Sequence, residues 1–198
     1  MIRISMRVLL ATMSLSVFAA TADAQRYPDT KGFFFGAAAN ATSIKFDETA
    51  FSDDRRENGY GLNLGLGYNF TRNLGLTFSI TGASINDSGT DDFDVAHADL
   101  GARVSFPGRS ALVPYIELSL AALAAEYVAE GTDVELEGGG LSGGVGLNYF
   151  FSRRLALDLN FHYTAGELSD GEIDGRDIDT NDVSFNTTRL NLGIAFYL

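Results

Sequence analysis

The segment TTRLNLGIAFYL, residues 187–198, decides the fold because its side chains alternate strictly between two environments. Its two rows are Leu190, Leu192, Ile194, Phe196 and Leu198 on one side, and Arg189, Asn191, Gly193, Ala195 and Tyr197 on the other. A period of two residues is that of a β-strand whose faces meet different surroundings. The sequence also stops on this strand, whereas chain ends usually fray in solvent. The pattern predicts a strand paired on both sides, as closure of a sheet into a barrel requires.

Residues 1–24 have the form of an export signal that is removed from the mature chain. Arg3 and Arg7 give a positive start, and the apolar stretch after them is too short to cross a bilayer as a helix. Ala22-Asp23-Ala24 fits a small-residue cleavage site. We expect a cleaved signal peptide over 1–24, a short lead over 25–30 and one domain over 31–198. An uncleaved membrane anchor is the alternative.

Composition narrows the class of the exported chain. The 198 residues include no cysteine, which excludes disulfides, cysteine-ligated metals and cysteine nucleophiles. The formal net charge is −12, and loss of residues 1–24 makes it one unit more negative. Nucleic-acid binding needs a basic surface, so no nucleic-acid partner is expected. No long hydrophobic run follows residue 24, so the chain is either a secreted soluble fold or a membrane protein that crosses with strands.

Alternating segments of about ten residues recur along the chain, a length that suits strands crossing a bilayer at a tilt. Eight are predicted, at residues 31–45, 59–70, 74–85, 94–106, 113–128, 139–151, 155–164 and 183–198. Short connections at 71–73, 107–112 and 152–154 alternate with longer, strongly acidic ones around 46–58, 86–93, 129–138 and 165–182. The prediction is an all-β fold, an eight-stranded antiparallel up-and-down transmembrane β-barrel, with short turns and both termini periplasmic and long loops extracellular.

Alternation alone does not say which face points inward, because a secreted, lipocalin-like barrel also alternates. The face opposite the apolar row is rich in small residues such as Gly61, Gly65 and Gly67, which fit the narrow interior of an eight-stranded barrel. The apolar row lacks the polar groups that a ligand-binding interior would carry. Aromatic residues near its ends predict a girdle at the lipid headgroups, made of Tyr60, Tyr68, Phe70, Phe106, Tyr149, Phe151, Phe161 and Tyr163. These features favour lipid outside.

Several ionisable residues fall on the inward face, where an isolated charge is costly and is expected to pair. They are Asp99, Arg103, Glu117, Asp158 and Arg189, with His97 and His162 nearby. The short turn at 107–112 places Arg103 opposite Glu117 on the next strand, which predicts a cross-strand ion pair. A later turn places Asn148 opposite Asp158 and predicts a hydrogen bond. Such charges either fill and rigidify the barrel or line a narrow, gated ion pore.

Three stretches carry a resemblance to a known family. They are Gly67-Tyr68-Asn69-Phe70 with Leu74-Gly75-Leu76, Val113-Pro114-Tyr115, and Phe196-Tyr197-Leu198. From about Lys31 onward the chain resembles the small outer-membrane β-barrels, which include OmpA-like, OmpX-like and opacity-protein-like barrels. The end of the chain is also similar to the signal that the barrel assembly machinery reads. Asn191, Gly193, Phe196 and Leu198 occupy its positions, although Leu198 stands where Phe is commonest.

The resemblance implies a place in the cell outer membrane, contact with its lipid and lipopolysaccharide, and a monomer. It implies no cofactor and no enzymatic activity, although the family hosts adhesins, structural anchors, small-solute channels and a few lipid-modifying enzymes. The main hypothesis is a structural or surface-interaction role with acidic extracellular loops. The alternative is a narrow porin-like channel for small solutes or ions. The sequence does not name a surface ligand.

One motif raises an enzymatic alternative. His162 and Thr164 are similar in spacing to the His and Ser of outer-membrane lipid A deacylases, where a His activates a hydroxyl. Alternation points both residues inward, whereas that reaction needs them at the lipid. A lipid A-modifying enzyme is therefore a remote alternative, and no catalytic residue is assigned.

The acidic segments suggest weak binding of divalent cations. Asp170, Glu172, Asp174 and Asp177 lie in one oxygen-rich stretch, but Asn181 stands where an EF-hand loop has Glu, so no firm metal site is assigned. Together with the other acidic loops, this stretch predicts an acidic outer rim. One hypothesis is that divalent cations bridge this rim to anionic lipopolysaccharide.

Overall fold

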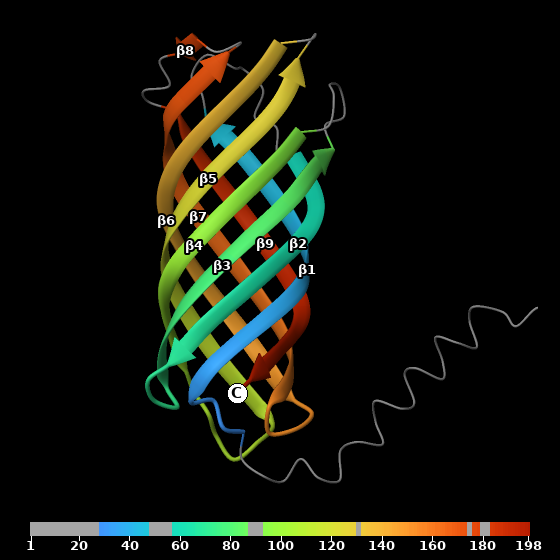
Figure 1. Ribbon diagram of the computed structural model, residues 1–198, viewed down its shortest axis with the longest axis vertical. Coiled ribbons are helices and arrows are strands. Elements are labelled where there is room, and N and C mark those ends of the chain that lie inside the picture. Colours follow the sequence, from blue (N-terminus) through green and yellow to red (C-terminus); the bar gives the residue numbers. More distant parts are fainter. Residues whose placement is uncertain (1–27, 48–56, 87–92, 130–131, 174–175, 179–182) are drawn as a thin grey trace, which may run out of the picture.

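The computed structural model describes residues 28–47, 57–86, 93–129, 132–173, 176–178 and 183–198. Its strands are β1 (Gly32–Asp47), β2 (Glu57–Asn69), β3 (Leu74–Asn86), β4 (Phe93–Ser105), β5 (Leu112–Ala129), β6 (Thr132–Phe150), β7 (Leu155–Ile173), β8 (Arg176–Ile178) and β9 (Ser184–Tyr197). The eight long strands form one closed antiparallel barrel, as predicted, and the short β8 pairs with the far end of β7 (Figure 1). Within the described ranges, no helix is long and apolar enough to cross a membrane.

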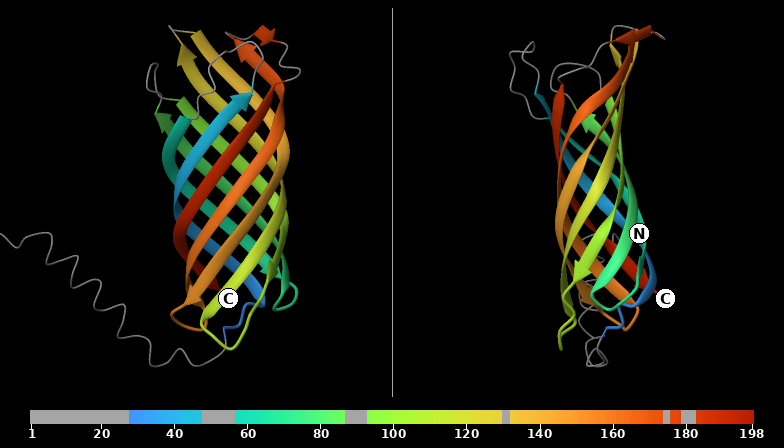
Figure 2. Two further views of the ribbon diagram at one scale, coloured as in Figure 1. Left: turned by 180° about the vertical axis from the view of Figure 1, so that it is seen from behind. Right: turned by 90° about the vertical axis from the view of Figure 1, so that its left-hand side faces the viewer.

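The C-terminal strand, β9, closes the barrel. β9 pairs with β1 on one side, where Phe196 lies opposite Phe35, and with β7 on the other, where Phe196 lies opposite Leu155. The C-terminus therefore lies at the end of the barrel that carries the short connections (Figure 2). We call this the turn end, and we call the opposite end, where β1 stops and β2 begins, the loop end.

Two strands are longer than the sequence pattern predicted. β6 begins at Thr132 rather than 139, and β7 continues to Ile173 rather than 164. The predicted connections 129–138 and 165–182 are therefore mostly strand. Their alternation continues beyond the lipid-facing stretch, but acidic residues replace the apolar outward row, so the hydrophobic signal fades while pairing continues. One irregularity in register, between Glu137 and Gly138, marks this transition.

The outer surface of the barrel is apolar. Along β2, the side chains of Leu62, Leu64 and Leu66 are 69%, 62% and 55% exposed, which places the predicted apolar row outward. Aromatic side chains gather at the turn end, where Tyr68 packs edge-on against Phe70 and Tyr149 against Phe151. The predicted girdle residues Tyr68, Phe70, Phe106, Tyr149 and Phe151 lie at the turn ends of β2, β4 and β6, whereas Tyr60 lies near the loop end and Phe161 and Tyr163 lie within β7.

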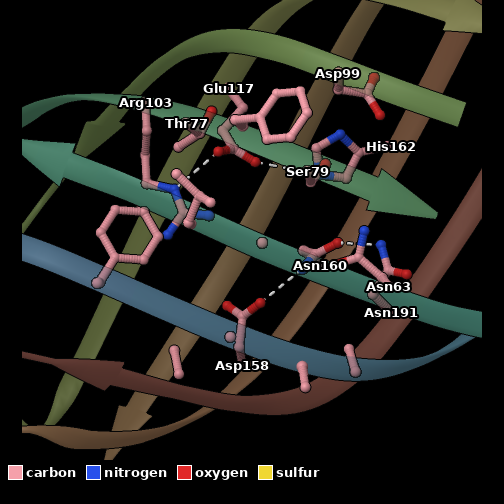
Figure 3. A pocket seen from close by; sticks show the side chains of 18 of the residues that line it. Asn63, Thr77, Ser79, Asp99, Arg103, Glu117, Asp158, Asn160, His162 and Asn191 are labelled. Carbon is pink, nitrogen blue, oxygen red and sulfur yellow. Dashed lines mark hydrogen bonds and ion pairs between the residues drawn. The ribbon is translucent and has the colours of Figure 1, made fainter.

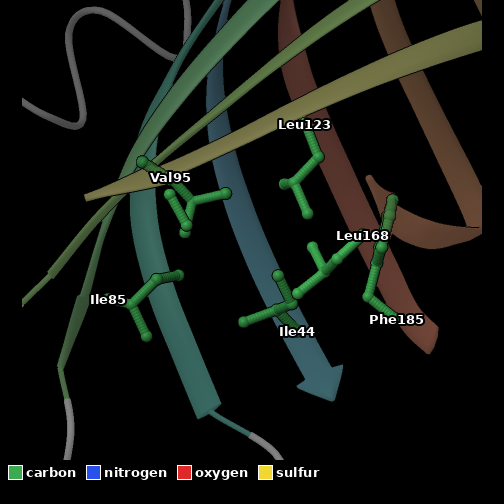
Figure 4. Packing of buried hydrophobic residues seen from close by; sticks show 8 residues of the cluster. Ile44, Ile85, Val95, Leu123, Leu168 and Phe185 are labelled. Atoms are coloured by element: carbon green, nitrogen blue, oxygen red, sulfur yellow. The ribbon is translucent and has the colours of Figure 1, made fainter. Parts of the chain in front are cut away.

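The interior has three layers, of which the sequence predicted only the middle, polar one. An apolar layer fills the loop end and includes Ile44, Ile85, Val95, Leu123, Leu168 and Phe185 (Figure 4). A second apolar layer fills the turn end and consists of Phe34, Val113, Phe150, Ala156, Ala195 and Tyr197. These residues lie on the inward face near strand ends, where the long polar rows of the strand centres give way to apolar side chains.

The lead before β1 is fastened to the turn end. Thr30 is buried and donates its hydroxyl to the carbonyl of Arg72, at 2.8 Å. The Arg72 guanidinium donates in return to the carbonyl of Pro28, also at 2.8 Å. The described part of the lead is therefore hydrogen-bonded to the β2–β3 turn at the turn end of the barrel.

Small residues set how closely the interior packs. A Cβ added at the inward-facing Gly146 would lie 2.2 Å from the Tyr115 ring carbon Cζ, a distance that real Cβ atoms do not reach. Three residues earlier on β6, a Cβ at the outward-facing Gly143 would meet nothing within 4 Å. Replacing each of these two glycines by alanine therefore distinguishes overpacking of the lumen from the general effect of replacing a glycine.

We predict that Gly146→Ala destabilises the barrel by about 1–3 kcal/mol, because the buried Tyr115 ring must shift. The matched change Gly143→Ala, on the same strand but facing outward, is expected to leave the free energy of unfolding unchanged or slightly raised. Urea unfolding of both refolded variants in the same detergent measures the difference. Equal stabilities for the two variants would contradict the packing described here.

Candidate functional site: the polar lumen

A small polar cavity lies in the middle of the lumen, between the two apolar layers. It offers about 50 Å³ to the centres of water molecules. The polar side chains that line it include Asn63, Thr77, Ser79, Asp158, Asn160 and His162 (Figure 3). A water needs about 10–15 Å³ of such space, so the cavity has room for a few waters or one small ion with part of its hydration. Five charged residues face this region.

Arg189 and Asp99 form the most buried ion pair. The guanidinium donates Nη1 to Asp99 Oδ2 at 2.5 Å and Nη2 to Asp99 Oδ1 at 2.9 Å, a two-point contact from β9 to β4. Nη2 also contacts the hydroxyls of Thr164, at 2.9 Å, and Ser142, at 3.3 Å. Arg189 is 2% exposed. One guanidinium therefore ties four strands together across the lumen.

The predicted ion pair between Arg103 and Glu117 is confirmed. The two residues are register partners on β4 and β5, and Arg103 Nε lies 2.9 Å from Glu117 Oε1. His162 Nε2 approaches the other carboxylate oxygen, Oε2, at 3.2 Å. The guanidinium carbon of Arg103 lies 4.7 Å from the ring centre of Phe34 and 4.0 Å from that of Tyr115. The positive charge of Arg103 thus lies between two aromatic rings, at the edge of the apolar layer of the turn end.

Asp158 has polar partners of a different kind. The Tyr115 hydroxyl donates to Oδ1 at 2.7 Å, and Asn160 Nδ2 donates to Oδ2 at 2.6 Å. The predicted hydrogen bond from Asn148 to Asp158 is wrong, although the two residues are register partners as expected. Asn148 Nδ2 instead donates to the Tyr197 hydroxyl of the turn-end apolar layer, at 3.2 Å, while the two oxygens of Asp158 accept from Tyr115 and Asn160.

A row of asparagines leads to Asp158, and the sequence analysis missed it. Asn40 Nδ2 donates to Asn191 Oδ1 at 2.7 Å, and Asn191 Nδ2 donates to Asn160 Oδ1 at 2.7 Å. Thr42 donates its hydroxyl to Asn40 Oδ1 at the start of the row. These asparagines are direct register partners on β1, β9 and β7. Finding this row requires the register of β9 against β1 and β7. A sequence indicates register only for two strands joined by a short turn, and β9 is joined to neither neighbour in that way.

The inward side chains of the deacylase-like motif have separate partners. His162 contacts Glu117, whereas Thr164 is fully buried and contacts Arg189. Both face the lumen, as alternation predicted, so neither is presented to a lipid acyl chain. The arrangement is one of ion pairing and packing rather than of a hydroxyl activated by a base.

The outward face of the loop end carries rows of acidic residues. Asp94, Glu126 and Glu135 are direct partners across β4, β5 and β6, and Glu137 lies opposite Asp170 on β7. All five side chains are exposed. Like charges directly opposite each other repel, so these rows favour a nearby cation or basic group. Within the described residues, no group of three or more His, Asp or Glu side chains is placed to hold a metal ion.

The remaining predicted sites are placed as follows. Asp174 lies outside the described residues, and Glu172 on β7 is the register partner of Asp177 on β8, so the Ca²⁺ suggestion for that stretch stays a prediction. Of the four residues matched to the assembly signal, Asn191 and Gly193 face the lumen, Phe196 packs against Phe35 at 5.4 Å between ring centres, and Leu198 is exposed. Their role in assembly also stays a prediction.

Comparison with solved structures places this fold among small bacterial barrels. Neisserial surface protein A is 19% identical and matches 85% of this chain and all of its own, with a TM-score of 0.63. The outer membrane protein OprG from Pseudomonas aeruginosa is 15% identical, covers 85% of this chain and 97% of its own, and has a TM-score of 0.57. Ail, the attachment invasion locus protein of Yersinia pestis, is 18% identical over 84% of this chain and 99% of its own, with a TM-score of 0.50.

Sequence comparison then settles the family. A search of curated proteins gives no significant match. The family model described as the outer membrane protein beta-barrel domain matches residues 8–196, which is nearly the whole chain. The apolar outer face and the closed sheet of this protein are those of a protein in the outer membrane. The chain belongs to the outer membrane protein β-barrel family and is located in the outer membrane.

Proposed function

We propose that this protein is a structural and surface-interaction barrel, and that its lumen does not serve as a solute pathway. The observation that carries the proposal is that side chains fill the lumen at three levels. The loop end is packed with aliphatic residues and Phe185, and the turn end with Phe34, Phe150 and Tyr197. Between them lie the ion pairs, the asparagine row and the small polar cavity. The turn end faces the periplasm and the loop end faces the medium in this proposal.

The lumen charges support a structural role. Arg189 and Arg103 each have a carboxylate partner at hydrogen-bonding distance, and neither projects a free charge toward an open path. A selective pore needs charges that can exchange with passing ions. Here the guanidinium of Arg189 is committed to four contacts on three other strands. The pairs therefore act as fixed cross-links between strands.

We predict that the refolded protein gives no resolved conductance steps in planar lipid bilayers. Arg103→Ala should also be silent, since Phe34, Tyr115 and Tyr197 still obstruct the turn end. A porin reconstituted in the same way serves as the insertion control. Regular conductance steps from the unaltered protein that change in size with Arg103→Ala would instead support the narrow-channel alternative.

The structural role also predicts how the buried ion pair affects stability. Arg189→Gln should lower the free energy of unfolding by about 3–5 kcal/mol, because it leaves the Asp99 carboxylate buried without a countercharge. The double change Asp99→Asn with Arg189→Gln should recover part of that loss. Urea unfolding in detergent measures all three proteins. A double variant less stable than Arg189→Gln by the full effect of Asp99→Asn alone would rule out this coupling.

At the loop end, we propose that divalent cations join the acidic rows to the phosphate groups of lipopolysaccharide. Asp94, Glu126 and Glu135 repel one another across three adjacent strands, and Glu137 repels Asp170. All five side chains are exposed and lie near the loop ends of their strands. A shared cation between these carboxylates and an anionic headgroup would relieve the repulsion on both sides. Further surface ligands would bind through the connections at this end.

This proposal predicts that lipopolysaccharide association depends on Mg²⁺. The unaltered protein should retain lipopolysaccharide through gel filtration in Mg²⁺ and lose most of it in EDTA. A variant with Glu126→Gln, Glu135→Gln and Glu137→Gln should retain equally little lipopolysaccharide in Mg²⁺ and in EDTA. Asp29→Asn, an exposed acidic residue at the turn end, is the matched control and should behave like the unaltered protein. Association that is indifferent to EDTA would end the idea.

A further inference from the structure

The charges around the central cavity do not balance. Asp99, Glu117 and Asp158 contribute three carboxylates, whereas Arg103 and Arg189 contribute two guanidinium groups; the one histidine in the lining, His162, contacts Glu117 and not Asp158. Asp99 pairs with Arg189, and Glu117 pairs with Arg103. Among the described residues, Asp158 has no Lys, Arg or His nitrogen within 4.0 Å, so its carboxylate forms no direct ion pair.

The hydrogen bonds around Asp158 keep this carboxylate in place as an acceptor. The Tyr115 hydroxyl donates to one oxygen and the Asn160 amide to the other. Behind Asn160, each amide N–H points to the next amide oxygen in the same direction, from Thr42 through Asn40 and Asn191. All the dipoles of this row present their positive ends toward Asp158. Hydrogen bonds aligned in this way strengthen one another, and here they stabilise a negative charge.

Space for a counter-ion adjoins the carboxylate. Asp158 and Asn160 line the cavity from β7, and the hydroxyls of Thr77 and Ser79 line it from β3 (Figure 3). Asn63, on the neighbouring strand β2, adds an amide side chain to the same wall. The cavity thus combines one carboxylate that forms no direct ion pair with neutral polar side chains and room for a small ion. The two apolar layers lie toward the two ends of the barrel from it.

The charge selects the class of ion. One unpaired carboxylate matches one positive charge, whereas Ca²⁺ and Mg²⁺ are commonly held by several carboxylates or by carboxylates with phosphates. The described residues offer no cluster of three acidic or histidine ligands. We propose that the lumen binds one monovalent alkali cation, held by the Asp158 carboxylate inside the central cavity. The site neutralises the interior of the barrel, and it is independent of the surface role proposed above.

The test uses Rb⁺ as the probe. The mature protein is refolded in detergent with RbCl, passed through a desalting column into N-methyl-D-glucamine chloride, and its retained Rb⁺ is measured by mass spectrometry. We expect one Rb⁺ per barrel for the unaltered protein and complete loss of retained Rb⁺ for Asp158→Asn, which keeps the size of the side chain. Asp94→Asn, which removes an exposed carboxylate at the loop end, should retain the ion. Refolding with equal KCl should reduce the retained Rb⁺.

Two results would overturn the proposal. One is absence of Rb⁺ from the unaltered protein both after desalting and in the anomalous difference density of crystals grown in RbCl. The other is equal retention by Asp158→Asn and the unaltered protein. A heat-dependent shift in gel mobility verifies that the variant has folded. If Asp158→Asn does not fold, the position of Rb⁺ in the crystals decides, and density away from Asp158 rejects the site.

Discussion

Closure of the sheet inside lipid is the constraint from which the rest of the structure follows. Hydrocarbon offers no hydrogen bonds, so every backbone N–H and C=O in the membrane must be paired within the protein. Pairing of β9 with both β1 and β7 removes the last free edges. Eight strands then enclose a space only wide enough for side chains. Any charged side chain that points inward must therefore find its countercharge inside the same narrow space.

The interior meets this demand in layers. Aliphatic and aromatic side chains fill the two ends, where they need no polar partners. The charges are confined to the middle, and the two guanidinium groups are held differently. Arg189 is surrounded by hydroxyls and a carboxylate, whereas Arg103 is stacked between Phe34 and Tyr115. Tyr115 belongs to both arrangements, since its ring packs on Arg103 and its hydroxyl binds Asp158.

The parts of this structure that could be predicted from sequence are those set by local spacing. Strand number and the pair Arg103–Glu117 follow from alternation and from a short turn, since a hairpin fixes the register of its two strands. The pair Arg189–Asp99 is separated by 90 residues and spans the lumen, so its distance depends on closure of the whole sheet. The asparagine row depends on the same closure. The extensions of β6 and β7 were missed because their outward residues are acidic rather than apolar.

The Arg189–Asp99 contact also has a consequence for the order of assembly. Asp99 lies on β4, in the middle of the chain, and its partner lies on β9, the strand that joins β7 to β1. Until β9 is in place, the Asp99 carboxylate has no countercharge, and Thr164 and Ser142 lack the guanidinium that contacts them. A barrel lacking its closing strand thus carries an electrostatic penalty as well as an open edge. The ion pair thus couples closure of the sheet to neutralisation of the Asp99 carboxylate.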